Sequence, residues 1–559
     1  MNRYLFCLLL WLIMIFAGAV PAADEFTSFI QIDEAYKLGH VDRAEMLYRK
    51  ALLLFSPEIA VHDKSASEIP MLKSATALLA EVRDNWDIFS PDQKLALSSM
   101  MARPSKQSNI VSPDGYFRVH YDSTGPEAVP PQDADADLIP DYVERIALYA
   151  DSSRRVNDQL GYYSPPQDGG TGGDDKYDIY LVSILAYGGT SPESPGDSSW
   201  NDYTSYILVH RNLYGFPPND DPQGDTIGAQ KVTCAHEYFH AVQLAYDFDI
   251  QNNLWWMEAT ATYMEEVVFP EVNDNYSYLP YFFNYPNRSI HYTNDDYHMY
   301  GAFVWPLYLS ERFNASVILE SWLACRYVTP FAAIDSALAD FGRRVSGVFP
   351  EFTIWNYFTN DRAGTTTYYP EGPNYPKMPL DRILPDLPHD SLQPVIRPDG
   401  LGCNYIRYAV EDTLRGILEV TLEGSPLVFW GAATISFAGS SPSIQYATAD
   451  GYQPIQFFIP FIEDYDSVVV IPGVVTYYLT GNYYYLSTKI LPYGDANYDR
   501  EVNVGDALYL VSYAFKGGPP PRPVYESGDA NCDGNIDVGD AVQLIGFIFK
   551  GGMAPCAER

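Results

Sequence analysis

The C-terminal part of the chain contains one acidic pattern twice, and this duplication constrains the fold more than any other feature. Each copy has oxygen-bearing side chains at alternate positions and runs into a short apolar segment that ends in Phe-Lys-Gly-Gly. Oxygen ligands at this spacing, closed by an acid at position 12, are typical of a calcium-binding loop. A pair of solvated acidic turns would not explain the duplication. The predicted calcium ligands are Asp495, Asn497, Asp499 and Asp506 in the first copy, and Asp529, Asn531, Asp533 and Asp540 in the second.

Two such loop–helix copies resemble a type I dockerin, in which position 12 of each loop is Asp. The resemblance implies a small α-helical, calcium-binding module over residues 491–559. It also implies a partner, either a cohesin-like scaffold or another domain of the same chain. Arg500 departs from the second copy, which has Gly534 there. Loop positions 10 and 11 are Val-Gly in both copies, where dockerins often have polar residues, so the identity of the partner stays open.

The second strong motif is His236-Glu237-Tyr238-Phe239-His240. Residues four apart share one face of a helix, so both imidazoles can bind a single metal ion. Zinc lowers the pKa of a bound water to about 7, and Glu237 can then accept its proton as general base. The motif alone also arises by chance. Apolar residues on both sides of it predict a buried helix, which favours the functional interpretation.

Glu258 is the predicted third zinc ligand. It lies in a second helical pattern downstream of the motif. Two His and one Glu leave the fourth zinc position to water, as catalysis requires. Glu265 and Glu266 are the alternatives. Glu265 lies two helical turns further on, and the alternative interpretation of both residues is a solvated helix end.

The motif and the pattern Trp-x-x-Glu-Ala-x-Ala-x-Tyr that follows it resemble the gluzincin metallopeptidases, which include thermolysin-like enzymes and zinc aminopeptidases. Residues from about 115 to 345 resemble, more closely, a group of secreted bacterial metallopeptidases. The resemblance implies an α+β zincin-like catalytic domain with the zinc ligands and base named above. Gluzincins stabilise the oxyanion with a later His or Tyr, for which Tyr300 and then His298 are the candidates. A packing role is the alternative for both.

A third acidic cluster precedes a predicted helix, Tyr142 to Leu160. It has acids at positions 1, 3, 5, 9 and 12 of a calcium loop, and a backbone carbonyl is available at position 7. Position 6 is Leu138 rather than the usual Gly. The alternative is an acidic helix N-terminus favoured by the helix dipole. The predicted calcium ligands are Asp133, Asp135, Asp137, Ile139, Asp141 and Glu144.

The remaining sequence predicts a multidomain chain. Residues 1–22 are typical of a signal peptide, and their apolar run is short for a membrane span. Residues 23–110 have helical spacing and form either a removable pro-segment or a helical subdomain. Residues 111–385 mix strands and helices as a peptidase domain does. Residues 386–490 carry short strands between turns, typical of a β-sandwich domain, with Pro472-Gly473 expected to separate two strands.

The net charge of −37 makes nucleic acid an improbable partner, because phosphate binding needs a basic surface. Together, the signal peptide, the zinc motif and the C-terminal repeat predict a secreted zinc peptidase, free or attached to the cell surface, that acts on protein or peptide. No transmembrane span is expected in the mature chain. The alternative function is a catalytically silent, calcium-braced surface or adhesion protein that retains the peptidase fold. Cys532 and Cys556 are a candidate disulfide in the C-terminal module.

Overall fold

The computed structural model describes residues 28–56, 71–294, 297–364, 368–439 and 441–557. The chain divides into two compact units. Unit 1 runs to residue 275 and includes 325–329, and unit 2 holds 276–324 and everything from 330 onward. Helices occur together with mixed and antiparallel sheets, which confirms a multidomain α+β organisation. The predicted signal peptide lies outside the described residues, and none of the described helices is long and apolar enough to cross a membrane.

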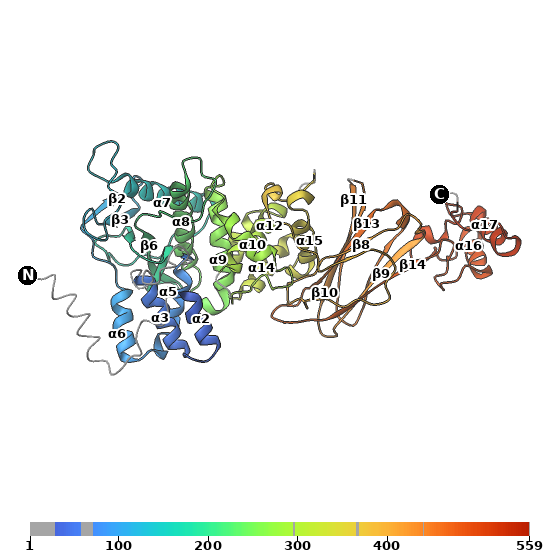
Figure 1. Cartoon of the computed structure of the whole chain (residues 1–559), viewed down its shortest axis with the longest axis horizontal. Helices are drawn as coiled ribbons and strands as arrows, with labels where there is room; N and C mark the ends of the chain where they lie inside the picture. Colours follow the sequence, from blue (N-terminus) through green and yellow to red (C-terminus); the bar gives the residue numbers. More distant parts are fainter. Residues whose placement is uncertain (1–27, 57–70, 295–296, 365–367, 440, 558–559) are drawn as a thin grey trace, which may run out of the picture. The chain divides into compact units, whose positions relative to one another are not determined.

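Unit 1 is built on a six-stranded mixed sheet (Figure 1). Its three central strands, β6, β4 and β3, are parallel; β2 runs antiparallel to β3, and β5 runs antiparallel to β6 but parallel to β1. The strands lie in the order β1 (Leu72–Ser74), β5 (Ala186–Pro195), β6 (Tyr203–His210), β4 (Tyr177–Val182), β3 (Phe117–Tyr121) and β2 (Ser108–Val111). β4 is buried along its whole length, as a central strand covered on both faces must be.

The N-terminal helices share one hydrophobic core with this sheet. Alternate residues of a strand point to opposite faces. Tyr180, Val182, Tyr206 and Leu208 therefore share one face, and they pack in the core that the N-terminal helices form. These helices lie together beside the sheet in Figure 1. They are α2 (Phe29–Lys37), α3 (Arg43–Phe55), α5 (Thr76–Asp84) and α6 (Pro91–Met100).

The helical spacing of residues 71–101 predicts helix throughout, and this prediction is wrong at its start. Leu72–Ser74 form β1, which pairs with β5 in parallel. Three residues are too few to show a period of their own, and the strand exists because the edge of β5 supplies hydrogen-bond partners. A distant partner thus overrides the local helical pattern.

Three long helices, all predicted, complete unit 1. They are α7 (Asp141–Leu160), α8 (Asp225–Gln243) and α9 (Ile250–Val268). α8 packs against α7, α9, β5 and β6, and every residue from Gly228 to Gln243 is buried. A helix that is buried on all sides is mostly apolar, and the polar residues that it does carry are out of reach of water. These residues therefore need hydrogen-bond or ionic partners inside the protein.

Unit 2 begins with helices and continues into two sheets. Its helices are α10 (Leu279–Phe283), α11 (His298–Gly301), α12 (Val304–Arg312), α14 (Pro330–Leu338) and α15 (Val345–Tyr357), with α13 (Ser316–Cys325) ending at the unit boundary. One sheet has the order β11 (Ser441–Ala449), β10 (Trp430–Ala438), β13 (Ser467–Val474), β8 (Ile406–Ala409) and β7 (Arg382–Leu384). The other is β12 (Ile455–Ile459), β9 (Ile417–Gly424) and β14 (Tyr484–Leu491), and both contribute to one core.

The prediction that Pro472-Gly473 separates two strands is wrong. β13 runs through both residues and ends at Val474, so residues 475–479 are not a strand. Pro472 lies opposite Ala432 of β10. β8 pairs with β13 only as far as Val470, so the missing N–H of Pro472 breaks no bond with that neighbour.

The C-terminal residues form two helices joined by loops. α16 (Val504–Lys516) and α17 (Val538–Lys550) pack together around Leu510 and Leu544. Each begins at a capping box and ends at a glycine in the left-handed conformation, as the duplicated sequence requires. A disulfide joins Cys532 to Cys556, which confirms that pairing.

Candidate metal centre

The three predicted zinc ligands converge between α8 and α9. His236 Nε2 lies 3.0 Å from His240 Nε2 and 3.2 Å from a carboxylate oxygen of Glu258. The same oxygen is 3.4 Å from His240 Nε2. Tetrahedral zinc, with bonds of about 2.0–2.1 Å, places its ligand atoms about 3.3 Å apart. These separations therefore fit one small metal ion bound by two nitrogens and one oxygen.

Both imidazole rings are held through their other nitrogen. His236 Nδ1 lies 2.7 Å from a carboxylate oxygen of Glu265, and His240 Nδ1 lies 2.7 Å from the side-chain oxygen of Gln243. The amide nitrogen of Gln243 in turn donates to the backbone oxygen of Met257. Acceptors on Nδ1 place its proton there and leave the Nε2 lone pairs for the metal, which is the arrangement of histidine ligands in metalloproteins.

The position of Glu265 in the sequence suggests a solvated helix end, but the structure buries this residue. Its side chain is about 1% exposed, and it contacts the outer nitrogen of His236 rather than the metal position. Its spacing of two helical turns from Glu258 puts both carboxylates on one face of α9, and this was the signal available in the sequence. The neighbouring Glu266 instead accepts a hydrogen bond from Asn275.

The predicted base is held by two threonines that belong to no motif in the sequence. One carboxylate oxygen of Glu237, Oε2, accepts hydrogen bonds from the hydroxyls of Thr76 (2.7 Å) and Thr190 (3.0 Å). The other oxygen, Oε1, is buried and has no hydrogen-bond partner among the described residues. A fixed Oε2 and an unpartnered Oε1 suit a carboxylate that is to accept a proton from a water molecule.

The electrostatics of the cluster favour its charged forms. Burial alone would lower the pKa of His236, but the adjoining carboxylates of Glu258 and Glu265 outweigh it and raise that pKa to about 9. Burial alone would raise the pKa of Glu258, but His240 and His236 lower it to about 2. A metal ion at this position therefore competes with a proton for His236, so its affinity must rise with pH.

Replacing Glu265 by Gln is expected to weaken zinc binding about 10- to 100-fold, because an amide oxygen is a weaker acceptor for His236 Nδ1–H than a carboxylate. Competition with a chelator of known affinity measures this change. Glu266→Gln is the matched control, since it removes the neighbouring carboxylate from the same helix and should leave the affinity unchanged. Equal affinities for the parent and Glu265→Gln would show that Glu265 does not support the ligand.

The two residues predicted to stabilise an oxyanion lie in unit 2. His298 is fully buried, and its two ring nitrogens lie 3.0 Å from the backbone oxygens of Tyr281 and Ser289. Tyr300 is 2% exposed and packs against the ring of Tyr278. These contacts agree with packing roles, and oxyanion stabilisation stays a prediction.

The acidic cluster before α7 forms a turn around Asp133. The carboxylates of Asp133, Asp135 and Asp137 each place an oxygen within 4.8 Å of the others. Leu138 takes the left-handed backbone conformation, with φ of 75°, in place of the expected Gly. Asp141 accepts a hydrogen bond from the backbone of Ala134 instead of joining this group. Burial is the main cause that raises the pKa of Glu144, and the neighbouring aspartates add to it. The backbone carbonyl of Ile139 stays a predicted calcium ligand.

The first C-terminal loop gathers Asp495, Asp499 and Asp506 within 4.8 Å. The backbone N–H groups of Asp499 and Arg500 donate to the Asp495 carboxylate. The second loop repeats these bonds, from Asp533 and Gly534 to Asp529. Among the described residues, the carboxylates of this second loop do not come within 4.8 Å of one another as a group, unlike those of the first. Asn497 and Asn531 each donate to the acid two residues later, Asp499 and Asp533. Asp506 and Asp540 each accept a hydrogen bond from the backbone N–H of the N-cap residue of α16 or α17.

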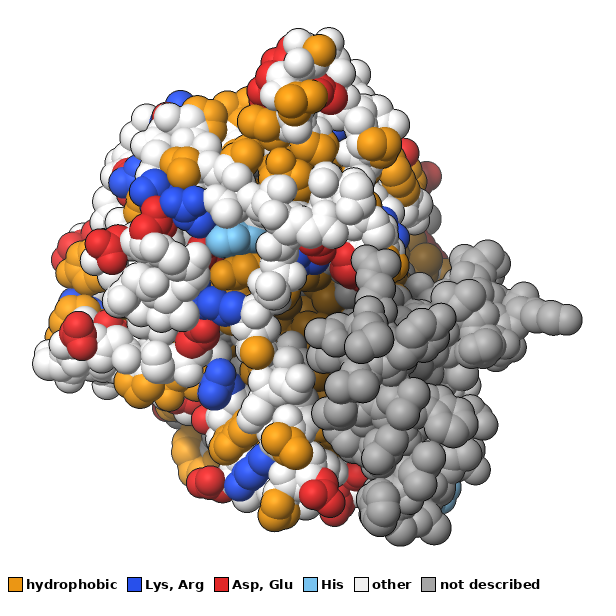
Figure 2. Space-filling view, turned by 90° about the vertical axis from the view of Figure 1, so that its left-hand side faces the viewer, with side chains coloured by type: hydrophobic (Ala, Val, Ile, Leu, Met, Phe, Trp, Pro, Cys, Tyr) orange, Lys and Arg blue, Asp and Glu red, His pale blue; other side chains and the backbone are white. Residues whose placement is uncertain are grey.

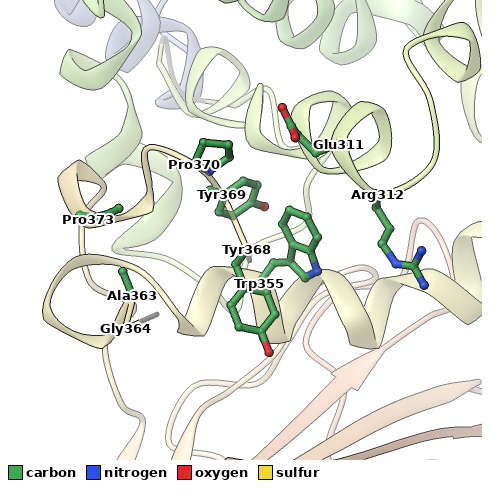
Figure 3. A pocket seen from close by; sticks show the side chains of 9 residues that line it. All are labelled: Glu311, Arg312, Trp355, Ala363, Gly364, Tyr368, Tyr369, Pro370 and Pro373. Atoms are coloured by element: carbon green, nitrogen blue, oxygen red, sulfur yellow. The ribbon is translucent and has the colours of Figure 1, made fainter. Parts of the chain in front are cut away.

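Other surface features carry less chemistry. Figure 2 shows a face on which basic and acidic side chains are interspersed, so the negative charge of the chain does not dominate there. A hollow in unit 2 is walled by aromatic and proline side chains (Figure 3), and its Arg312 is paired with Glu351. The lining residues are Glu311, Arg312, Trp355, Ala363, Gly364, Tyr368, Tyr369, Pro370 and Pro373.

The chain was compared with models of known protein families and with curated proteins. Neither comparison finds a match.

Proposed function

We propose that this protein is a secreted zinc peptidase with a zincin-like catalytic domain of the gluzincin type. The observation that carries the proposal is the convergence of His236, His240 and Glu258 at tetrahedral separations, beside the unpartnered Oε1 of Glu237. Two nitrogens and one carboxylate oxygen are a donor set of catalytic zinc sites and leave one position open.

The protein's own residues supply orientation and proton transfer. Bound zinc would supply Lewis acidity and lower the pKa of a water to about 7. Glu237 would then accept a proton at Oε1, while Thr190 of β5 fixes the direction of its carboxylate through Oε2. The Glu265 and Gln243 contacts keep both histidine rings aimed at the metal position. Because the centre is buried, this geometry is fixed before a substrate arrives.

Calcium binding and tethering complete the proposal. The loops at Asp133 and Asp495 gather carboxylates as hard-cation sites do, and the second C-terminal loop repeats the first in sequence. We assign a dockerin-like module to residues 491–559 and a β-sandwich to 386–490. The module would dock on a cohesin-like scaffold or on another part of the chain.

A catalytically silent, calcium-braced surface protein is the second candidate. One observation favours it: His236, Glu237, His240 and Glu258 are each at most 1% exposed, so a substrate does not reach them in the described conformation. A silent protein, however, has no need for a fixed base beside an unpartnered oxygen. The two candidates differ in whether zinc-loaded protein cleaves peptides.

Metal analysis and a peptide-library assay test the proposal together. We expect one zinc ion per chain and cleavage of library peptides that stops on chelation. His240→Ala removes a nitrogen ligand and should abolish both zinc binding and cleavage. Full zinc occupancy in that variant would contradict the ligand set. Zinc-loaded protein that cleaves no peptide, even after proteolytic trimming of its N-terminal segment, would favour the silent candidate.

A further inference from the structure

The N-terminal segment reaches the metal centre along the edge of the sheet. β1 pairs with β5 so that Leu72 lies opposite Ala186 and Ser74 opposite Gly188. The backbone N–H of Ala75 continues the pairing by donating to the oxygen of Gly188 (2.8 Å). A strand edge pairs with one strand at a time, so β5 offers these groups to no other peptide while β1 is in place.

The same segment contacts the proposed base. The hydroxyl of Thr76 donates to Glu237 Oε2, and it also accepts a hydrogen bond from the backbone N–H of Thr190 (2.7 Å). A β-carbon placed on Gly188 would lie 2.9 Å from the Glu237 side chain, so β5 passes directly beside the base. A chain paired with β5 at this point is therefore held against Glu237.

A buried ion pair fixes the segment to the other side of the centre. Lys73 is 2% exposed, and its ammonium group lies 2.9 Å from Glu265, the partner of His236. It also pairs with Asp274, which is equally buried. Without Lys73, these two carboxylates would remain buried without their cation, which strongly disfavours the closed arrangement.

We propose that residues 72–76 are an autoinhibitory plug, which keeps the peptidase latent until they leave β5. The inference rests on the proposed function. In the closed state, β1 occupies the edge beside Glu237, and the metal ligands are buried. Once the plug is displaced, β5 presents free backbone groups next to the base, where an extended peptide can bind by strand addition. The expected substrate is therefore an unfolded or loop segment of a protein rather than a helix.

Weakening the plug in the full-length chain should open the centre. Lys73→Met is expected to raise the rate at which a chelator removes zinc on the order of 100-fold, because it leaves two buried carboxylates unpaired in the closed state. Thr76→Val is expected to raise it about tenfold, because it removes the hydrogen bond to the Glu237 carboxylate and leaves the backbone N–H of Thr190 without its acceptor. The rate of zinc uptake should rise in parallel, so zinc affinity changes little. Cleavage of a short fluorogenic peptide should rise by similar factors.

Two variants control for general damage to the fold. Lys106→Met removes another lysine whose side chain is 3% exposed, but whose ion pair is with Asp122. Thr204→Val removes another buried threonine hydroxyl, which bonds to the backbone of Ser194. Neither should change zinc exchange or cleavage. If Lys73→Met fails to fold, as judged by circular dichroism, Thr76→Val carries the test.

Two results would overturn the plug. One is zinc exchange at the parental rate in both variants. The other is a lower kcat with unchanged KM in Thr76→Val that Thr76→Ser restores, which would make Thr76 a positioning residue of the active enzyme. Failure of the proposed function looks different: zinc exchange would accelerate as expected, but neither parent nor variants would cleave any peptide.

Discussion

Glu237→Gln is expected to leave one zinc ion per chain bound while kcat falls about 10²- to 10⁴-fold, which is the usual contribution of a general base. Glutamine has the same shape, and its amide can still contact the hydroxyl of Thr190, which holds the carboxylate in the parent. It cannot accept a proton at the oxygen beside the metal position. The variant therefore removes the proton transfer without removing a ligand.

The measurement pairs zinc content with steady-state kinetics on protein processed in the same way as the parent. KM should change little, because Glu237 is expected to act in the transition state rather than in substrate binding. Glu271→Gln is a suitable control, since that carboxylate is exposed and pairs with Lys231 rather than with the centre. Near-parental turnover in Glu237→Gln would assign the base to another residue.

Removing calcium is expected to unfold the C-terminal module while the rest of the chain stays folded. Asp495, Asp506, Asp529 and Asp540 are all nearly buried, and the shared core of α16 and α17 is small. Carboxylates crowded in so small a module repel one another unless a cation lies between them. Hydrogen exchange of the full chain tests this: amides of both helices should be protected with calcium and exchange rapidly with chelator.

The pH dependence of this effect has a defined sign. Burial raises the pKa of Asp495, Asp506 and Asp540 in the folded module. Groups with a raised folded pKa contribute stability below the ordinary value of about 3.9 and lose it as the pH rises through the folded pKa. With chelator present, the module should therefore be more protected at acidic than at neutral pH, and calcium should restore protection at neutral pH. Equal protection with and without chelator at neutral pH would refute calcium-dependent folding.

The sequence predicted the parts of the centre that lie within one helix or are visible as a repeat. His236 and His240 are four residues apart, so their convergence follows from helix geometry alone. Glu258 could be proposed because α9 also has a helical pattern. The structure places all three together, although the metal itself stays a prediction.

The supporting residues could not be predicted in the same way. Thr76 and Lys73 lie far along the chain from the residues that they contact, and neither belongs to a recognisable motif. β1 is too short to interrupt a helical pattern visibly. Pro472 can lie inside β13 because β8 stops pairing at Val470, so no partner on that side needs the N–H that proline lacks. In each case the deciding partner is distant in sequence, and a local pattern carries no information about it.

The shared core of the N-terminal helices and the sheet has a consequence for biosynthesis. During translation, α2, α3, α5 and α6 emerge before β4, β5 and β6. The apolar face carrying Tyr180, Tyr206 and Leu208 therefore meets its cover as soon as it forms. A truncated chain that begins after α6 would form this face without the helices that cover it. Its exposed aromatic side chains would then promote aggregation of the newly made protein. Recombinant production thus needs the N-terminal segment during folding, even where the finished protein works without it.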